Sequence, residues 1–357
     1  MPHIGIIGGG IAGLCVAFRR LAHGDRVTLF EAGPRLGGQL QTERSGGLLI
    51  EHGAEGFVAG STAVFELARA LGLAGDLLDQ SVTDSCRFDG QRLIRLEPGE
   101  AGRLLGFQVA PRALGKGIQS FTLGMSQVVD VLSQNVAPVA RVSCGSDVQT
   151  LRPAADGGWA ISGRQNDERV DRVVVATGAE AAAGVLGEVF GATALALASS
   201  TALDSVTVSL VYGRAEVAHP LDATGFVVSE EATLEGFRAC TFASSKLVGR
   251  APTDRALLRL FFRPTAEELR DFDDAAWTER AERCVRRALD LRAPAARSWV
   301  SRWPRALPVF DDAHRARVTA LEAKLAGSGV CLAGAAFHGA GIDGAVRSAE
   351  AAAQSLD

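Results

Sequence analysis

Three glycines near the start of the chain have the spacing needed to hold a diphosphate group. The apolar residues 3–7 are followed at once by Gly8, Gly10 and Gly13, and then by residues with helical spacing. The first glycine permits a sharp turn, the second lets the backbone approach a pyrophosphate, and the third lets the helix pack against the strand. The start of the helix offers unpaired N–H groups and a positive dipole end to the phosphates.

A carboxylate stands where a ribose would need a hydrogen-bond acceptor. Residues 26–30 predict a second strand, and Glu31 closes it, eighteen residues after Gly13. A carboxylate in that position accepts hydrogen bonds from ribose hydroxyls. The order strand, glycine turn, helix, strand and acid therefore predicts a dinucleotide site, because an ordinary glycine-rich turn does not need the other parts.

The next two segments indicate a larger cofactor. Residues 32–39 hold a second glycine pair and Arg35, and residues 51–57 form a glycine-containing turn after an apolar strand. With these motifs the sequence resembles the flavin amine oxidase and protoporphyrinogen oxidase superfamily. The resemblance implies FAD, with its diphosphate and flavin against the two segments. Gln39 is a departure, because many members carry another Arg there.

The far end of the chain resembles the C-terminal flavin motif of the same superfamily. Residues 329–350 read as a strand, a glycine loop and a helix. The resemblance implies that Gly334 lies against the cofactor and that the amides near Ala345 and Val346 face the pyrimidine edge of the flavin. A helix N-terminus stabilises the negative charge that develops there on reduction. Both chain ends would then form one domain, whereas an Ala-rich helix packed only for stability would leave the glycine loop unexplained.

The middle of the chain contributes further positions through the same resemblance. Residues 171–179 resemble a strand that ends beside the cofactor, which implies that Thr177 and Gly178 border it and that Val148 contacts the adenine. Trp303 would pack near the flavin; for Trp303 and Val148 a core position is the alternative. The residues expected to bind FAD are Gly8, Gly10, Ile11, Ala12, Gly13, Glu31, Ala32, Arg35, Gly37, Gly38, Gln39, Gly53, Ala54, Glu55, Val148, Thr177, Gly178, Trp303, Gly334, Ala335, Gly344, Ala345 and Val346.

The cysteines predict a non-covalent cofactor and a reducing compartment. Relatives that attach the flavin covalently use a Cys in the C-terminal loop, whereas Cys331 lies in the strand before Gly334. The six cysteines are scattered, which predicts neither a disulfide framework nor a metal site. We therefore expect non-covalent FAD, no metal and a cytoplasmic location.

Several stretches resemble protoporphyrinogen oxidase in particular, among them residues 120–132, 205–212 and 303–308. One departure is the connection from Phe57 to Gly124, which has only about 67 residues. Family members usually have considerably more chain there, and the resemblance implies that it builds helices that cover the substrate. The shortened connection predicts either an open site or a wall supplied by a protein partner or by a second copy in a homodimer.

Four side chains are candidates for work on the substrate. His338 stands just ahead of a glycine loop, and its ordinary pKa near ~6.5 suits proton removal, although it could instead cap the loop or face solvent. Glu55 could face the substrate or hydrogen-bond the cofactor loop. Lys246 and Arg263 could attract a substrate carboxylate, although solvated charges are commoner. His338 and Glu55 are the catalytic candidates.

Composition excludes other classes of function. The 37 basic and 41 acidic residues give a net charge of −4, which is the wrong sign for a basic nucleic-acid-binding surface. No run approaches the ~18 apolar residues of a membrane-spanning helix, so we expect no transmembrane segment. Amine oxidases usually surround the substrate with aromatic rings, and because Tyr212 is the only Tyr, such a cage is disfavoured.

The predicted fold is an α/β, Rossmann-like FAD-binding domain of the GR2 type with a second, smaller α+β substrate domain. The first would comprise residues 1–82, 124–200 and 298–357, and the second residues 83–123 and 201–297. The resemblance implies an FAD-dependent oxidase of the protoporphyrinogen oxidase type, which passes electrons from a porphyrinogen or a smaller cyclic nitrogen-containing substrate to molecular oxygen. The alternatives are a flavin amine or amino-acid oxidase of a specialised pathway and a non-catalytic flavoprotein.

Overall fold

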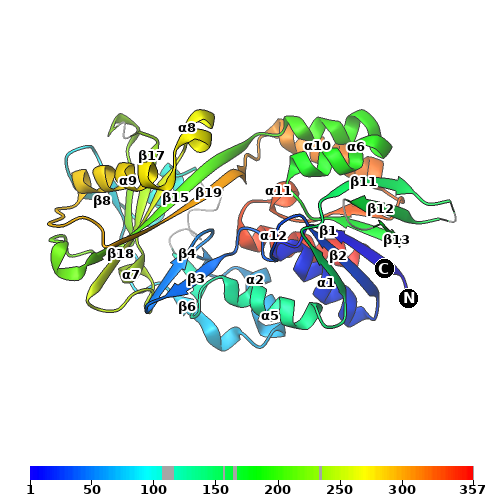
Figure 1. Ribbon diagram of the computed structural model, residues 1–357, viewed down its shortest axis with the longest axis horizontal. Coiled ribbons are helices and arrows are strands. Elements are labelled where there is room, and N and C mark those ends of the chain that lie inside the picture. The colour runs from blue at the N-terminus through cyan, green and yellow to red at the C-terminus, as the bar shows by residue number, and fades with distance from the viewer. Residues whose placement is uncertain (107–115, 156, 164–166, 233–234, 357) are drawn as a thin grey trace.

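The computed structural model describes residues 1–106, 116–155, 157–163, 167–232 and 235–356. Its strands form two main sheets, which Figure 1 shows at opposite ends of the molecule. The N- and C-terminal ends lie close together beside the parallel sheet, at the right of the figure. The predicted α/β fold class is confirmed, and both ends of the chain contribute strands to one parallel sheet.

The parallel sheet has five strands in the order β10–β2–β1–β14–β20. Side chains alternate along β1, so that Ile4 and Ile6 enter the core on one face and Ile7 enters the core on the other. The strands β1, β14 and β20 are buried and largely apolar, as in a sheet covered on both faces, whereas the edge strand β10 is partly exposed and half polar. The bounds are β1 His3–Ile7, β2 Arg26–Glu31, β10 Arg141–Cys144, β14 Arg172–Val175 and β20 Val330–Leu332.

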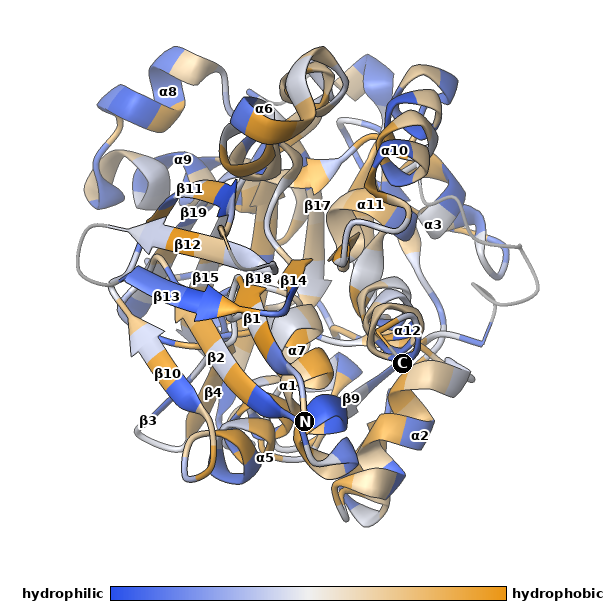
Figure 2. Ribbon diagram, turned by 90° about the vertical axis from the view of Figure 1, so that its right-hand side faces the viewer, coloured by the Kyte–Doolittle hydropathy of each residue, from blue (hydrophilic) through white to orange (hydrophobic). Residues whose placement is uncertain are grey.

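Helices cover one face of this sheet, and a small antiparallel sheet with two helices covers the other. On the first face α1 contacts α12 and α5, and α12 contacts α2; on the second, α6 contacts β11 and α10. Figure 2 shows the apolar strands β1 and β2 and the hydrophilic strand β13 nearer the surface. The bounds are α1 Ile11–His23, α2 Thr62–Ala70, α5 Ser126–Val136, α12 Gly341–Gln354, β11 Val148–Pro153, β12 Trp159–Gly163, β13 Asp167–Val170, α6 Ala179–Leu195, α10 Asp312–Leu325 and α11 Ala335–His338.

The second sheet has seven strands in the order β19–β15–β18–β17–β16–β7–β8. Val208, Leu210 and Tyr212 of β15 point to the face covered by α9, where Trp277 is fully buried. Val211 points to the other face, toward Leu48 and Ile50 of the cofactor domain. The bounds are β19 Arg297–Pro308, β15 Ala202–Gly213, β18 Arg255–Phe262, β17 Phe237–Phe242, β16 Gly225–Val228, β7 Cys86–Phe88, β8 Leu93–Arg95, α8 Ala266–Asp271 and α9 Asp274–Ala288.

Short elements connect the two sheets. One hairpin pairs β3 with β4, and a three-stranded sheet pairs β9 with both β5 and β6. The bounds are β3 Thr42–Ser45, β4 Leu48–Glu51, β5 Phe57–Val58, β6 Leu77–Asp79, β9 Ile118–Phe121, α3 Glu100–Leu104 and α7 Ala243–Lys246, with 3₁₀ turns at Ala74–Asp76, Ala196–Ser199, Arg214–Glu216 and Glu230–Ala232.

Two strands cross the predicted domain boundaries. Residues 298–357 were expected in the cofactor domain, yet β19 is paired with β15 along the seven-stranded sheet. Conversely, β9 falls in the expected substrate domain but pairs with β5 and β6. Strand β19 is thus hydrogen-bonded to the expected substrate domain and β9 to the expected cofactor domain, the reverse of the predicted ranges. The domain ranges stay an interpretation.

One helix has the length and composition of a membrane span. The segment Ala179–Ser199, which is α6 with the 3₁₀ turn after it, has 21 residues and a mean hydropathy of 1.7. Two glutamates, Glu180 and Glu188, interrupt its apolar sequence, and Gly191 has non-helical dihedral angles that break it. Core helices have the same composition, and α6 packs on β11 and α10.

Candidate functional site

The first glycine turn has the shape that a bound diphosphate requires. A side chain at Gly8 would meet Ala176 O at 2.5 Å, and one at Gly13 would meet Gly8 O at 1.9 Å. These contacts keep the turn tight and let α1 begin directly above β1. In contrast, a Cβ at Gly10 would meet nothing within 4 Å. Gly10 therefore borders open space at the N-terminus of α1, where phosphate oxygens would lie against backbone N–H groups.

Glu31 joins the two glycine loops from the end of β2. Its Oε2 accepts a hydrogen bond from the amide of Gly9 at 2.8 Å, and its Oε1 accepts one from the amide of Gly33 at 2.7 Å. A carboxylate has about four acceptor positions, so two remain for ribose hydroxyls. The predicted ribose contact fits this geometry, and Glu31 has an additional structural role that its spacing did not reveal.

The second glycine loop is braced by Arg35. The guanidinium donates to Leu36 O at 3.0 Å and Gly38 O at 2.7 Å, and the amide of Gly37 donates to Gly9 O at 2.8 Å. These bonds hold the second loop against the first, so both can close over one diphosphate. Gln39, the expected departure from the resemblance, donates to Ala306 O at 3.1 Å and so connects this loop to β19.

The C-terminal motif reaches the same place from β20. Gly334 has φ +114°, a backbone conformation that favours glycine, and its missing Cβ would lie 3.5 Å from Ala12 Cβ. Helix α12 starts at Gly341, so Ala345 and Val346 lie beyond its first turn, where amides bond within the helix. The free amides belong to the first turn, nearer Gly341, and the flavin contact implied for Ala345 and Val346 stays a prediction. Ala345 and Val346 are buried in the core against α1.

A turn at His52 and Gly53 connects the cofactor domain to the seven-stranded sheet. The carbonyl of His52 accepts from Trp303 Nε1 at 2.7 Å, Thr207 Oγ1 at 3.1 Å and Arg259 Nη2 at 3.4 Å. Arg259 also donates to Gly53 O. The three donors come from β19, β15 and β18, which are neighbours in the sheet. We call this arrangement the His52 clamp.

Gly53 packs too tightly for any side chain. A Cβ there would lie 1.6 Å from Gln39 O, so the turn presses against the second glycine loop. Trp303, implied to lie near the flavin, thus acts on the backbone of this turn. Thr207 and Arg259 were missed from the sequence. A signal was present, because both are polar residues within apolar strands, as in Val206-Thr207-Val208.

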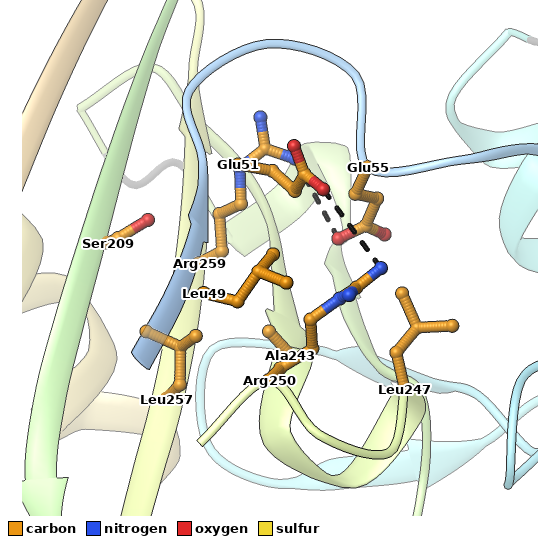
Figure 3. Close-up of a pocket in the computed structure, with 9 residues that line it drawn as sticks. All are labelled: Leu49, Glu51, Glu55, Ser209, Ala243, Leu247, Arg250, Leu257 and Arg259. Carbon is orange, nitrogen blue, oxygen red and sulfur yellow. Dashed lines mark ion pairs between the residues drawn. The ribbon is translucent and has the colours of Figure 1, made fainter. Parts of the chain in front are cut away.

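Two carboxylates, Glu51 and Glu55, lie close to Arg250 and to Arg259 of the clamp, as Figure 3 shows. Glu55 Oε1 is 2.5 Å from Lys246 Nζ, and Glu55 Oε2 is 3.7 Å from Arg259 Nη1. Glu51 Oε1 lies 4.0 Å from Arg250 Nη2, and Glu51 also accepts hydrogen bonds from the amide of Met125 and from a threonine hydroxyl. Lys246, a candidate for attracting a substrate carboxylate, is therefore already paired.

The two carboxylates have pKa values that move in opposite directions. Burial alone would raise the pKa of Glu55, but the charges of Lys246 and Arg259 outweigh it and lower the pKa. Burial raises the pKa of Glu51, because its hydrogen bonds and more distant cations compensate less. Glu55 is thus held ionised by its cations, which favours a structural role over proton removal; its catalytic role stays a prediction.

His338 lies between the C-terminal helices. Its Nδ1 is 2.6 Å from Ser348 Oγ and its Nε2 is 2.6 Å from Glu322 Oε1. The Ser348 hydroxyl also accepts from the amide of Gly334 at 3.0 Å, so His338 supports the loop after β20. It lines a hollow beside β20, between α10 and α12. Both ring nitrogens are engaged, and the role as proton acceptor remains a prediction that this geometry does not favour.

The remaining predicted positions lie around the ends of the parallel strands. Val148 is buried in the core with Phe30, while Thr177 Oγ1 donates to Gly178 O, at the end of β14. A Cβ at Gly178 would meet nothing within 4 Å, so this residue also borders open space. Across the residues described, no group of three or more His, Cys, Asp or Glu is arranged to hold a metal ion.

Comparison with known proteins identifies the family. Residues 6–71 match the sequence profile of the NAD(P)-binding Rossmann-like domain, and residues 93–356 match that of the flavin containing amine oxidoreductases. The coproporphyrinogen III oxidase of Bacillus subtilis is 22% identical over 460 aligned positions, which cover 98% of this chain and 97% of that protein. The enzyme of the same name from Mycobacterium leprae is 43% identical over 99 residues, 26% of this chain and 21% of that protein.

Solved structures share the fold over almost the whole chain. A suggested protoporphyrinogen oxidase from Exiguobacterium sp. 255-15 superposes with a TM-score of 0.84 at 20% identity, covering 99% of this chain and 98% of the other. Cyclohexylamine oxidase from Brevibacterium oxydans IH-35A superposes with a TM-score of 0.75 at 16% identity and the same coverage. The glycine cradle, Glu31 and the C-terminal loop fit the FAD of this family. The chain belongs to the flavin containing amine oxidoreductase family and is an FAD-dependent oxidoreductase.

Proposed function

We propose that this protein oxidises a porphyrinogen and passes the electrons to molecular oxygen. The observation that carries the proposal is the character of the sheet face that meets the His52 clamp. Tyr212, the only Tyr, is fully buried on the opposite face, under α9. On the clamp side, Thr207 and Arg259 are buried in the clamp, while Phe261 and Arg263 are partly exposed, so this face offers the cation of Arg263 and no tyrosine.

The cation of Arg263 on this face suits a substrate with acidic side chains better than a small amine cation. Cationic residues repel an amine but attract carboxylates. The names of the relatives agree, because the Bacillus subtilis protein, aligned over nearly the whole chain, is a coproporphyrinogen III oxidase. Relatives named as amine oxidases match in fold at lower identity.

The chain's own residues would bind and orient the reactants. Bound FAD supplies the hydride acceptor and the route of two electrons to oxygen, with one peroxide released per pair. Gly10 and the start of α1 would hold its diphosphate, and Glu31 would hold a ribose. The His52 clamp ties the turn after β4 to β15, β18 and β19, so it would keep the seven-stranded sheet in a fixed position relative to a cofactor bound beside this turn. Glu55, held ionised, keeps Lys246 in place.

A second candidate, oxidation of a smaller cyclic amine, is favoured by the length of the chain. The alignment with the Bacillus subtilis protein has 460 positions, so about 110 of them have no residue here. A reduced cover suits a smaller substrate. If the substrate is a porphyrinogen, we propose that a second copy of this chain or another protein covers the substrate in place of the missing residues. The mass of the FAD-loaded protein in solution tests whether a second copy is bound.

Anaerobic flavin reduction separates the two candidates. The FAD-loaded protein is mixed without oxygen with coproporphyrinogen III, protoporphyrinogen IX, or a panel of primary and cyclic amines, and the flavin absorbance is followed. We expect bleaching by a porphyrinogen, then porphyrin fluorescence and peroxide when oxygen is admitted. Bleaching by an amine alone would establish the second candidate and contradict the first.

A further inference from the structure

Three side chains form a row across the end of the seven-stranded sheet that lies nearest the cofactor domain. Ser205 of β15 is paired with Trp303 of β19, and Val206 is paired with Phe262 of β18. By the same register, Ser205 lies between Trp303 on one neighbouring strand and Arg263, the residue after β18, on the other. Adjacent strands are about 4.8 Å apart, so Trp303 and Arg263 are separated by roughly 10 Å across a small residue.

Arg263 points to the same face as the clamp. Alternation along β18 puts Leu257, Arg259 and Phe261 on that face, and Arg263 follows two residues later. Leu257 packs on strand β4 of the cofactor domain, Arg259 reaches the carbonyls of the clamp, and its Cζ lies 4.7 Å from the Phe261 ring centre. Arg263 thus lies on the same face of the sheet as the clamp, beyond Arg259 and Phe261 along the chain.

The guanidinium of Arg263 has no acidic partner among the residues that the structure describes. Its one hydrogen bond is a long one, from Nη1 to Asp204 O at 3.5 Å, and the Asp204 carboxylate accepts instead from the amide of Arg305 at 2.7 Å. The side chain is nonetheless half-buried, where a charged group is usually paired. The more deeply buried Arg250, by contrast, faces Glu51.

A second unpaired arginine stands next to it. Arg238 is the extra residue of a bulge between Phe237 and Ala239 of β17, and the amide of Arg263 donates to Gly236 O just before that bulge. Within the described parts of the chain Arg238 also has no acidic partner. Burial, followed by the charge of Arg238, lowers the pKa of Arg263, which fits two cations in one partly buried place.

We propose that Arg263, supported by Arg238, is the recognition site for a carboxylate of the substrate. The planar guanidinium can bind both oxygens of a carboxylate, which would neutralise a charge that the protein leaves unpaired. The site selects substrates that carry carboxylate side chains, such as the propionates of a porphyrinogen. This inference rests on the proposed function and adds the group by which the substrate is recognised.

Ligand binding tests the site separately from turnover. FAD-loaded wild type, Arg263→Gln, Arg263→Lys and Arg238→Gln are titrated with coproporphyrin III and with its tetramethyl ester in one detergent-containing buffer, and quenching of flavin fluorescence is measured. The control Arg287→Gln removes an exposed arginine from α9, on the far side of the sheet. Thermal unfolding confirms that each variant is folded.

We expect Arg263→Gln to weaken coproporphyrin III binding at least tenfold and Arg238→Gln to weaken it less. Arg263→Lys should recover part of the affinity, ester binding should change little, and Arg287→Gln should match the wild type. In turnover of coproporphyrinogen III, Arg263→Gln should raise KM with kcat nearly kept. Equal binding of coproporphyrin III by wild type and Arg263→Gln overturns the inference. So does a loss of affinity for the tetramethyl ester as large as that for coproporphyrin III, or a wild type that does not bind coproporphyrin III.

The results keep the two proposals apart. If coproporphyrin III binds through Arg263 but no porphyrinogen bleaches the flavin, the carboxylate site stands and the proposed reaction is wrong. If coproporphyrinogen III is oxidised with equal KM by wild type and Arg263→Gln, the reaction stands and the carboxylate site is wrong.

Discussion

Glu31 acts on the protein's own backbone as well as on the cofactor. Its two oxygens each hold one loop amide, from Gly9 and Gly33, and so set the distance between the loops that enclose the diphosphate. The sequence predicts the acid from its place after β2. The sequence does not predict the hydrogen bond from the Gly33 amide, because the conformation of the loop, and not the spacing of the residues, brings that amide back to the carboxylate.

The exchange Glu31→Gln should weaken FAD binding roughly ten- to a hundredfold, about 1–3 kcal/mol. The amide keeps one oxygen acceptor, so one loop amide loses its partner and the ribose contact weakens. Titration of the FAD-free protein with FAD measures the change. Glu188→Gln on the surface of α6 is the control and should bind FAD like the wild type. An unchanged affinity in Glu31→Gln would remove the acid from the site.

The paired carboxylates Glu51 and Glu55 give opposite dependences of stability on pH. Glu55 has a lowered pKa in the folded protein. Its contribution to folding stability is therefore fully present above the pKa of about 4.3 that it has in the unfolded chain, and it is lost as the pH falls through the lower pKa of the folded state. Glu51 has a raised pKa, so ionising it costs stability as the pH rises from about 4.3 through its higher native value.

We therefore expect the stability lost in Glu55→Gln to grow as the pH rises from about 3 to 5 and then to stay level at roughly 3 kcal/mol, because Lys246, which is mostly buried, is left without its partner. The loss in Glu51→Gln should shrink as the pH rises from about 4.3 toward 7. Urea unfolding at several pH values measures both, and each variant is the control for the other. Parallel curves for the two variants would show that the assigned pKa directions are wrong.

At the scale of elements, the His52 clamp shows what the sequence predicts and what it does not. The motifs around Gly8 and Gly334 are local, so strand, turn and helix can be read directly. Trp303 and His52 are 251 positions apart, and their contact depends on a register shift between Leu203 and Ser205. Such a shift arises from packing of the whole sheet, so the clamp could not be predicted from the sequence. The only signal in the sequence was the presence of polar residues such as Thr207 and Arg259 within apolar strands.

The turn at Gly53 should tolerate no side chain. In Gly53→Ala the new Cβ would lie 1.6 Å from Gln39 O, so the turn or the second glycine loop has to move. We expect the variant to fold with a lower thermal midpoint and to lose most of its FAD on gel filtration. Gly75→Ala is the matched control, because a Cβ there meets nothing within 4 Å. Full FAD retention by Gly53→Ala would show that this turn does not set the cofactor site.

At the scale of the whole molecule, the cofactor site is built from distant parts of one chain. Strand β1 and strand β20 flank β14 in the parallel sheet, and the His52 clamp ties the turn after β4 to three strands of the other sheet. The α/β class and the meeting of the chain ends follow from sequence motifs. The division between the domains does not, because β9 and β19 pair across it.

A ligand held by both chain ends and by the turn after β4 should stabilise all of them together. Binding to the folded chain alone stabilises it by RT ln(1 + [L]/Kd), about 2.7 kcal/mol at a hundredfold excess of FAD over Kd. We expect the unfolding midpoint to rise with FAD concentration, with flavin release and loss of secondary structure in one transition. In Glu31→Gln the same rise should need roughly ten- to a hundredfold more FAD. Flavin release well before unfolding, with a midpoint independent of FAD, would show that the cofactor does not join the two ends of the chain.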